Sequence, residues 1–214
     1  MAEQEGVIKY RLDFQPADAP CDSAAFRSLR AWRAVLHRLA LVGQQPDRYL
    51  GYGYGNVSLR AQPGFIISGT QTGAPEQLPP DGYAHVRGCN VSANHIEAYG
   101  VVKPSSEALT HGAVYAVDPE IGCVLHVHSP ELWAHAQAYP ATAADVPYGT
   151  PAMAQAVSAL YHSTPLPELG LFTMRGHEDG VVAFGTTPEH AGTRLVAALA
   201  EVLASATSSQ ARAR

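Results

Sequence analysis

The sequence is poor in lysine and has no long hydrophobic run. Only two of its 14 basic residues are lysines, Lys9 and Lys103, and its 214 residues carry a formal net charge of −5. Surfaces that bind nucleic acid or anionic membranes need clustered Lys and Arg, so this charge balance argues against both partners. No stretch approaches the roughly 18 uninterrupted apolar residues of a membrane span.

Cysteine is also too scarce for a disulfide framework. The three cysteines, Cys21, Cys89 and Cys123, lie far apart and form no Cys-x-x-Cys pair. This usage is typical of proteins of the reducing cytosol. Residues 1–20 contain several charged side chains and no apolar core of a signal peptide. We therefore expect a cytoplasmic protein.

The remaining composition is that of a globular domain. Hydrophobic residues make up 46% of the chain and charged residues 15%, which excludes a disordered or fibrous protein. The length suffices for a core without disulfide or metal staples. We expect one domain over 1–214, with an N-terminal extension at 1–20 and a frayed tail at 205–214, where the apolar pattern ends.

Periodic apolar residues predict helices, and alternating β-rich runs predict strands. Several helices are preceded by a Ser or Thr placed to cap them. The predicted helices cover residues 23–42, 105–117, 151–161 and 188–204, with a further start at Ser129-Pro130. The predicted strands cover residues 56–60, 65–68, 83–87, 95–102, 121–127, 171–174 and 181–184. Because strands occur in runs rather than in strict alternation with helices, we expect a mainly antiparallel sheet flanked by helices.

Two of the ten histidines share one face of a predicted strand. His126 and His128 are one residue apart, so the strand period of two places both imidazoles on one side and Leu125 and Val127 on the other. An isolated His-x-His pair also arises by chance. Shared binding of one cation, however, explains two imidazoles near the end of an apolar strand.

Glu107 and His177 extend this pair to a candidate ligand set. Glu107 lies in the first turn of helix 105–117, which a short connection joins to the histidine strand. Taken alone, Glu107 is explained as an acid that complements the helix dipole, and His177 as a histidine on a solvated turn. Together the four residues offer three neutral nitrogens and a carboxylate, which suits zinc or a similar divalent ion.

The order of the motifs resembles the class II aldolase/adducin family, whose best-known enzymes are fuculose-, rhamnulose- and ribulose-phosphate aldolases and epimerases. The resemblance covers residues 23–204 and implies a three-layer α/β/α fold around a mainly antiparallel sheet. It also implies a cyclic homotetramer with active sites near the subunit interfaces. The motifs that carry it are Gly55–Arg60, Ile67-Ser68-Gly69, Pro104-Ser105-Ser106-Glu107, His126-Val127-His128-Ser129 and the late His177.

The resemblance also implies residue roles. The metal ligands fall on His126, His128 and His177, and the carboxylate that binds the metal at rest and moves protons during turnover falls on Glu107. The phosphate-binding residues of the family fall on Asn56, Ser68, Gly69, Ser105 and Ser106. The N–H groups at a helix start attract anions, which supports this assignment. As an alternative, Ser105 merely caps its helix and Gly69 merely makes a turn.

A divalent ion, most simply Zn²⁺, next to a carboxylate supports a limited set of reactions. The ion stabilises an enediolate, and Glu107 can move the proton that creates or quenches it. We expect a lyase of carbohydrate metabolism that makes or breaks a C–C bond next to a carbonyl, by an aldol or retro-aldol step. The expected substrate is a small, phosphorylated hydroxy-ketone or keto acid. The alternatives are a decarboxylase or epimerase at the same site, and an adducin-like interaction module without catalysis.

Several features depart from the sugar-phosphate aldolases, and two of them bear on the proton donor and on access to the site. The C-terminal tail contains no tyrosine to serve as a proton donor. Tyr139, Tyr148 and Tyr161 remain as candidates, and Tyr148 is the best placed, although it is explained equally well as a packed aromatic residue. The segment between the second and third motifs is longer than usual, so residues 70–95 are predicted to form a flap that faces the substrate.

Overall fold

The computed structural model describes residues 6–20 and 22–212, so Cys21 lies outside the described residues. Its centre is a mixed sheet of nine strands in the order β1-β7-β6-β5-β4-β8-β11-β10-β9. The edge pairs β1–β7 and β9–β10 are parallel, and the pairs between them are antiparallel. A separate ribbon pairs β2 with β3. The strands are β1 Arg11–Pro16, β2 Gly43–Gln44, β3 Gly53–Tyr54, β4 Asn56–Arg60, β5 Phe65–Ser68, β6 Tyr83–Asn90, β7 His95–Gly100, β8 Cys123–His128, β9 Ala141–Thr142, β10 Leu171–Met174 and β11 Gly180–Gly185.

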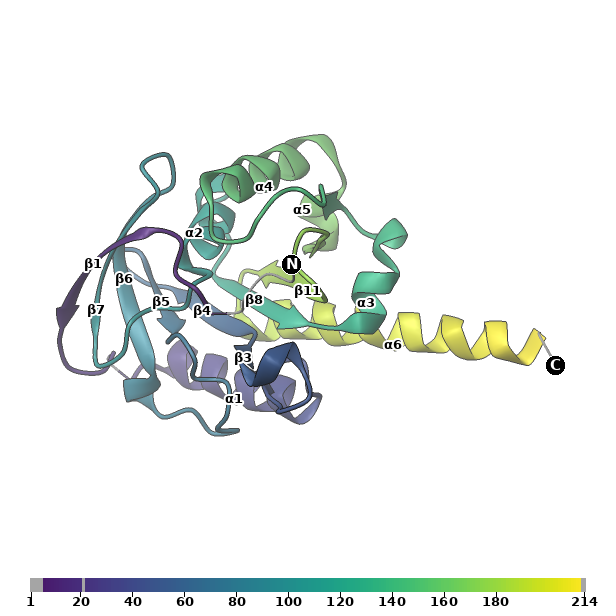
Figure 1. The fold of residues 1–214 in the computed structure, drawn as a ribbon, viewed down its shortest axis with the longest axis horizontal. Coiled ribbons are helices and arrows are strands. Elements are labelled where there is room, and N and C mark those ends of the chain that lie inside the picture. The colour runs from purple at the N-terminus through teal and green to yellow at the C-terminus, as the bar shows by residue number, and fades with distance from the viewer. Residues whose placement is uncertain (1–5, 21, 213–214) are drawn as a thin grey trace.

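Helices cover both faces of the sheet (Figure 1). Helices α1, α3 and α6 pack on one face, and α2, α4 and α5 pack on the other. Within the described residues no helix has both the length and the apolar content needed to cross a membrane. The helices are α1 Ala24–Arg38, α2 Ala108–Val117, α3 Pro130–Ala134, α4 Pro151–Ser163, α5 Leu166–Leu169 and α6 Pro188–Arg212, with short 3₁₀ turns η1 Tyr49–Gly51, η2 Pro80–Gly82 and η3 Ala136–Ala138.

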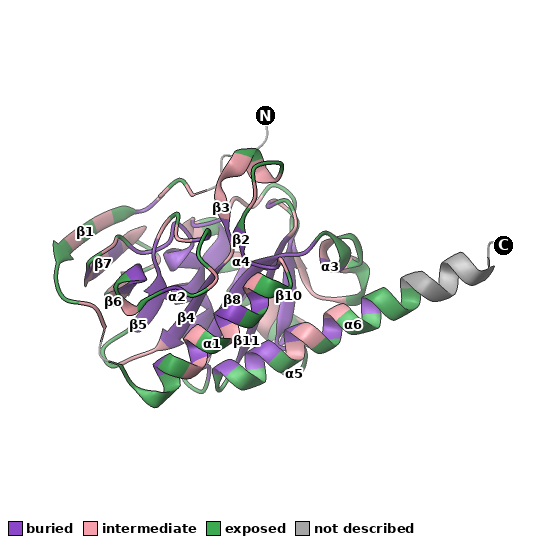
Figure 2. Ribbon diagram, turned by 90° about the horizontal axis from the view of Figure 1, so that it is seen from below, coloured by how far each residue is buried: buried purple, intermediate pink, exposed green. Residues whose placement is uncertain are grey.

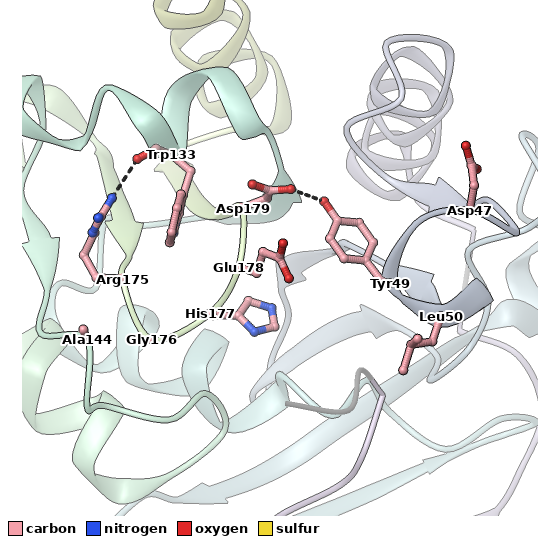
Figure 3. Close-up of a pocket in the computed structure, with 10 residues that line it drawn as sticks. All are labelled: Asp47, Tyr49, Leu50, Trp133, Ala144, Arg175, Gly176, His177, Glu178 and Asp179. Carbon is pink, nitrogen blue, oxygen red and sulfur yellow. Dashed lines mark hydrogen bonds between the residues drawn. The ribbon is translucent and has the colours of Figure 1, made fainter. Parts of the chain in front are cut away.

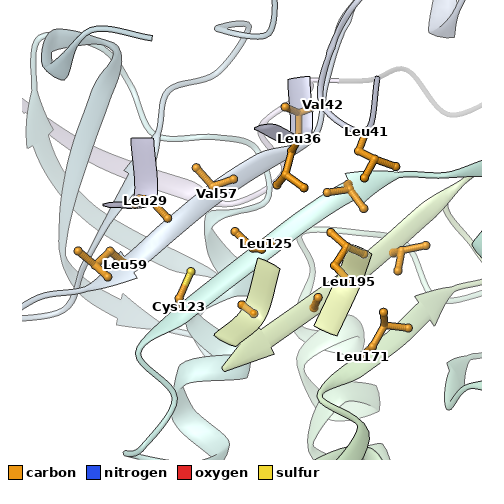
Figure 4. Close-up of a cluster of buried hydrophobic side chains, with 14 of the residues drawn as sticks. Leu29, Leu36, Leu41, Val42, Val57, Leu59, Cys123, Leu125, Leu171 and Leu195 are labelled. Atoms are coloured by element: carbon orange, nitrogen blue, oxygen red, sulfur yellow. The ribbon is translucent and has the colours of Figure 1, made fainter. Parts of the chain in front are cut away.

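Strand β8 lies in the middle of the sheet and contributes to both cores (Figure 2 shows its burial). Leu125 and Val127 belong to the core under α1 and α6, which Figure 4 shows around Leu125 and Leu195. Val124 belongs to the core under α2 and α4. All six residues of β8 are buried. Because side chains alternate along a strand, His126 and His128 lie on the Val124 face, as the sequence predicts.

The predicted helix caps are present. Ser23, Ser129, Thr150 and Thr187 each accept a hydrogen bond from the backbone N–H three residues later, at 3.1–3.3 Å. A proline follows three of these four residues, where its missing N–H costs no hydrogen bond. These caps fix the starts of α1, α3, α4 and α6 where the sequence places them.

Three helix boundaries differ from the prediction by three residues or more. Helix α1 ends at Arg38 rather than near 42, because Ala40 adopts a left-handed backbone with φ +55°. Helix α2 begins at Ala108 rather than 105, because residues before it form a turn in which the Ala108 N–H bonds the Ser105 carbonyl. Helix α6 continues past 204 to Arg212, so the expected frayed tail is helical as far as that residue. Its last turns lack an apolar stripe, but they also lack any Gly or Pro that would end a helix.

Two predicted segments also prove to be part of the sheet. The N-terminal extension contains β1, which the sequence did not predict because only alternate side chains of this edge strand are partly buried. The predicted flap at 70–95 contains β6, which pairs with both β5 and β7. Buried Tyr83, Ala84 and Val86 hold β6 in place, so residues 70–82 and the turn at 91–94 remain outside the sheet.

Candidate metal centre and adjoining pockets

Three of the ten histidines meet at one end of β8. His126 and His128 lie on β8, and His177 lies in the turn between β10 and β11. Strand β11 pairs with β8 so that Gly180 stands opposite His128, which brings the turn over the histidine pair. One nitrogen from each ring lies within 4.8 Å of the other two, and the Nε2 atoms of His128 and His177 are 3.1 Å apart.

The geometry of this histidine cluster fits a divalent cation. Two nitrogen ligands of a tetrahedral zinc ion lie about 3.3 Å apart, close to the observed separation of the His128 and His177 nitrogens. The Nε2 atom of His126 is buried and has no hydrogen-bond partner among the described residues. A buried nitrogen without a partner is costly, and a bound cation would remove that cost.

Asn56 stands behind His126 and fixes its ring. Asn56 and His126 are directly opposite on β4 and β8, and the Asn56 Nδ2 lies 3.1 Å from the His126 Nδ1; turning the amide over would put its oxygen at this position. With the amide oxygen toward the ring, Oδ1 accepts the Nδ1–H, and the lone pair of Nε2 is left for a cation. That orientation also satisfies the Asn56 Oδ1 atom, which otherwise is buried without a partner among the described residues.

Burial keeps the three imidazoles neutral. It lowers the pKa of His126 to about 3. The pKa of His128 is also well below the ordinary value, first because of burial and then because of His177, His126 and Arg48. Burial, followed by His126 and Lys9, likewise lowers the pKa of His177. Neutral imidazole is the form that binds metal ions, so the cluster is ready for a cation at neutral pH without releasing protons.

Glu107 completes the set that the sequence predicts. It is the N-cap residue of α2 rather than a first-turn residue, and its side chain is buried. Its Oε1 lies 4.0 Å from the Nε2 of His177. The Ser105 hydroxyl accepts a hydrogen bond from the Glu107 N–H at 3.2 Å, which holds the turn before the helix. The structure therefore brings His126, His128, His177 and Glu107 together.

A small pocket next to Glu107, here called the cradle pocket, has a volume of about 20 Å³. It contains four of the five residues predicted to bind phosphate. Ser68 does not line it, because its hydroxyl accepts a hydrogen bond from the Val57 N–H at 3.1 Å inside the sheet. The lining residues are Gly6, Gly53, Gly55, Asn56, Gly69, Thr70, Gln71, Thr72, Gly73, Ser105, Ser106 and Glu107.

The segment Thr70–Gly73 is a part of this pocket that the sequence reasoning missed. The signal for it was visible as a run of small and hydroxyl residues, Gly69-Thr70-Gln71-Thr72-Gly73. The Thr72 hydroxyl donates to the Gly69 carbonyl at 2.7 Å, which closes this loop on itself. Backbone N–H and hydroxyl groups in such a loop are suited to an anion's oxygens.

Arg33 of α1 holds the loop at residues 72–76 in place. Its buried guanidinium donates hydrogen bonds of 2.8–3.3 Å to four backbone carbonyls, those of Thr72, Gly73, Pro75 and Glu76. The sequence places Arg33 on a helix but gives no sign of this contact, because it joins residues about 40 positions apart. Arg33 thus holds the loop that lines the cradle pocket, although Arg33 itself does not line the pocket.

Replacing Arg33 with methionine is expected to destabilise the protein by about 3 kcal/mol, because four carbonyls lose their partner while the side-chain volume is kept. Urea unfolding measures this change, and limited proteolysis should show faster cleavage within 70–78. The control is Arg38→Met, which removes an exposed ion pair with Glu76 from the same helix and should change neither readout appreciably. Equal effects of the two variants would contradict the anchoring role.

Of the three candidate tyrosines, Tyr148 alone lies next to the histidine cluster. Its buried ring is 4.7 Å, centroid to centroid, from that of His177. Tyr139 packs against the core on the opposite face of the sheet. Tyr161 donates its hydroxyl to Asp118 at 2.6 Å. The nitrogen of Lys9 lies 3.5 Å from the Tyr148 ring centroid, a contact that the sequence does not indicate.

On the other side of His177 lies a wide pocket of about 630 Å³ (Figure 3). Its wall holds the Tyr49 hydroxyl, which donates to Asp179 at 2.6 Å, and the Arg175 guanidinium, which stacks 4.3 Å from the Trp133 ring centroid. Aromatic walls with a few charged groups suit a small polar organic molecule. The lining residues are Asp47, Tyr49, Leu50, Trp133, Ala144, Arg175, Gly176, His177, Glu178 and Asp179.

Comparison with known proteins identifies the family. Residues 47–204 match the family model described as the Class II Aldolase and Adducin N-terminal domain. The chain belongs to this family. No curated protein sequence matches it. Members of the class II aldolase group use a divalent metal ion, and the histidine cluster is the group of described residues suited to hold one.

Solved structures with the same fold share little sequence with the chain. L-fuculose-1-phosphate aldolase from Thermus thermophilus is 18% identical, with a TM-score of 0.59 over 88% of this chain and 93% of that one. YgbL from Klebsiella pneumoniae, whose activity is provisionally assigned as aldolase, epimerase or decarboxylase, is 20% identical, with a TM-score of 0.61 over 83% and 86%. A sugar-phosphate aldolase from Thermotoga maritima is 15% identical, with a TM-score of 0.61 over 86% and 97%. At these identities the likeness establishes the α/β fold, and the activity of this chain is a separate question.

Proposed function

We propose that this protein is a divalent-metal-dependent lyase of the aldolase type. The observation that carries the proposal is the position of the predicted ligand set between two pockets. His177 lines the wide pocket, whereas Glu107 and Asn56 line the cradle pocket. A substrate in the wide pocket would reach the histidine cluster through His177, with its anionic group directed toward the cradle pocket. The proposed reaction makes or breaks a C–C bond next to a carbonyl of a small, phosphorylated hydroxy-ketone or keto acid.

The residues divide the chemical work. His126, His128, His177 and Glu107 would hold the ion, which when bound polarises a carbonyl and stabilises negative charge next to it. Glu107 is buried next to the cluster, so it can take a proton from the substrate carbon or return one. The turn at Ser105-Ser106, just before the α2 N-terminus, offers hydroxyl and N–H donors to an anionic group.

Tyr148 is the proposed second proton donor. Its contact with His177 supports this role, because it places the residue next to the ligand set. The same buried contact also supports the alternative, in which Tyr148 only packs against the imidazole and fixes its orientation. Retained activity in a Tyr148→Phe variant would favour the packing role.

The chemistry of the donors supports Zn²⁺ as the ion. Three imidazole nitrogens and one carboxylate oxygen form a ligand set that zinc accepts readily, whereas magnesium and calcium prefer sites made of oxygen alone. The family resemblance supports a homotetramer, and the cysteine usage supports a location in the cytoplasm. We include both in the proposal.

A decarboxylase or an epimerase at the same centre is the second candidate. Both reactions create negative charge next to a carbonyl, and the structural likeness to YgbL supports both as alternatives. An adducin-like interaction module is the third candidate. The retention of all four predicted ligands in one buried cluster counts against that module, because a protein without catalysis would be free to lose them.

The decisive experiment is a substrate panel. The zinc-loaded protein is incubated with phosphorylated and free ketoses and with β-keto acids, and aldehyde, carbon dioxide and new stereoisomers are measured. We expect aldehyde release from a phosphorylated hydroxy-ketone, its loss after treatment with a chelator and its return with added Zn²⁺. Carbon dioxide or stereoisomers without aldehyde would favour the second candidate. A protein that binds no divalent ion and changes no substrate would favour the third.

A further inference from the structure

The N-terminal segment lies across the candidate site. Gly6 lines the cradle pocket, and its carbonyl accepts a hydrogen bond from the Thr70 hydroxyl at 3.4 Å. Four residues later, the Tyr10 hydroxyl donates to the Ser105 carbonyl at 2.7 Å, and Tyr10 is buried. The segment therefore contacts both the cradle loop and the turn that precedes α2.

The backbone at Lys9 is held between these two contacts. The Asn94 amide donates to the Lys9 carbonyl at 2.9 Å, and the Arg11 N–H donates to the Asn94 carbonyl at 2.8 Å, where β1 begins. The Lys9 nitrogen then lies 3.5 Å from the centroid of the Tyr148 ring, which packs on His177. The fold thus places an ammonium group against Tyr148, the side chain that packs on His177.

The residues that line the cradle pocket supply no positive charge. Among its lining residues Glu107 is the one with a charged side chain, and that charge is negative. Two arginines lie close by, but their donors are used elsewhere. Arg33 binds four carbonyls of the cradle loop, and Arg48 donates to the Ala40 carbonyl and to two tyrosine hydroxyls. A charge-assisted contact is the strong way to hold a desolvated anion.

We propose that Lys9 binds the anionic group of the substrate, a phosphate or a carboxylate, at the metal centre. This assignment rests on the proposed function, because it deepens the same site. The N-terminal segment is then a working part of the site rather than an extension of the domain. A lysine is suited to this role because its compact ammonium on a flexible stem can move from the Tyr148 ring to an anion.

The first test measures anion binding rather than turnover. Zinc-loaded wild-type protein and the Lys9→Met variant are titrated by calorimetry with inorganic phosphate and, separately, with acetate. We expect Lys9→Met to weaken binding of one of these anions at least about 10-fold, the loss of one charge-assisted hydrogen bond. The anion that responds identifies the group. Unchanged affinity for both anions, or no binding of either to the wild type, would overturn the proposal.

Two matched variants separate the role of Lys9 from a general effect of charge. Lys9→Arg keeps the charge and should bind the same anion within about threefold of the wild type. Arg11→Met removes an exposed positive charge two residues away, at the start of β1, and should leave binding unchanged. The zinc content of every variant is measured, so loss of the metal, which would count against the proposed function, is distinguished from loss of the anion contact. An equal effect of Lys9→Met and Arg11→Met would rule out a specific contact.

The scarcity of lysine provides a second, independent readout. Lys9 and Lys103 are the two lysines of the chain, so each yields its own peptide after amine-reactive labelling and mass spectrometry. We expect the anion identified by calorimetry to slow labelling of Lys9 at least about threefold relative to the exposed Lys103, because a bound ammonium is shielded. Equal labelling of Lys9 with and without the anion would contradict the contact.

Discussion

Replacing His128 with alanine is expected to remove the divalent ion and to abolish turnover. The substitution takes away one of the three buried imidazoles proposed as ligands, whose nitrogens lie within 4.8 Å of one another. Even residues that only orient ligands typically change metal affinity 10- to 100-fold, so loss of a ligand should cost at least about 100-fold. Elemental analysis of the purified variant, together with a zinc-dependent activity assay, measures both effects.

The matched control is His162→Ala. His162 is exposed in the last turn of α4, and its Nδ1 bonds the Ser158 carbonyl within that helix. We expect this variant to keep its metal and its activity. Because His128 is fully buried, circular dichroism is needed to show that the His128 variant folds, and His126→Asn provides a second, milder test of the same cluster. A folded His128→Ala protein with wild-type zinc content would refute the metal assignment.

The Glu107→Gln variant is expected to lose turnover by about 10²- to 10⁴-fold, the usual contribution of a positioned acid or base. Glutamine has the same shape, so the turn before α2 and the packing at the buried position should persist. The sensitive measurement is exchange of deuterium from solvent into the substrate carbon next to the carbonyl. This exchange isolates proton transfer from cleavage of the C–C bond.

The control for Glu107 is Glu120→Gln, which changes an exposed glutamate in the loop after α2. Its exchange rate should equal that of the wild type. The zinc content of Glu107→Gln separates the two proposed roles of this residue. Retained zinc with slow exchange indicates a base, and loss of zinc indicates that Glu107 acts mainly as a ligand. Exchange at the wild-type rate would exclude Glu107 as the base.

Local patterns in the sequence were enough to predict the framework of the site. The strands at 56–60, 65–68 and 171–174 have the predicted bounds, because alternating residues and flanking turn signals define them. The period of two along β8 also placed His126 and His128 on one face. These features depend on neighbours within a few positions, which is the range over which a single sequence is informative.

Contacts between distant segments could not be predicted. The Arg33 bonds to the cradle loop and the Lys9 contact with Tyr148 join parts of the chain that no local pattern connects. Strand β9 and helix α5 are too short to show a period. His177 lies over the pair on β8 because β11 pairs with β8, and no local pattern in the sequence predicts that pairing. Its role in the ligand set was therefore supported mainly by the family resemblance.

The two edge strands of the sheet have a consequence for how copies of this chain can associate. Strand β9 has two residues, and β1 ends in Pro16 and carries the charged residues Arg11 and Asp13. Addition of a further strand to a sheet edge is a common route to aggregation, and short, charged or proline-bearing edges resist it. The polymerisation of sheets edge to edge is therefore disfavoured at both ends. Any ordered assembly of copies would therefore use helix and loop surfaces rather than the strand edges.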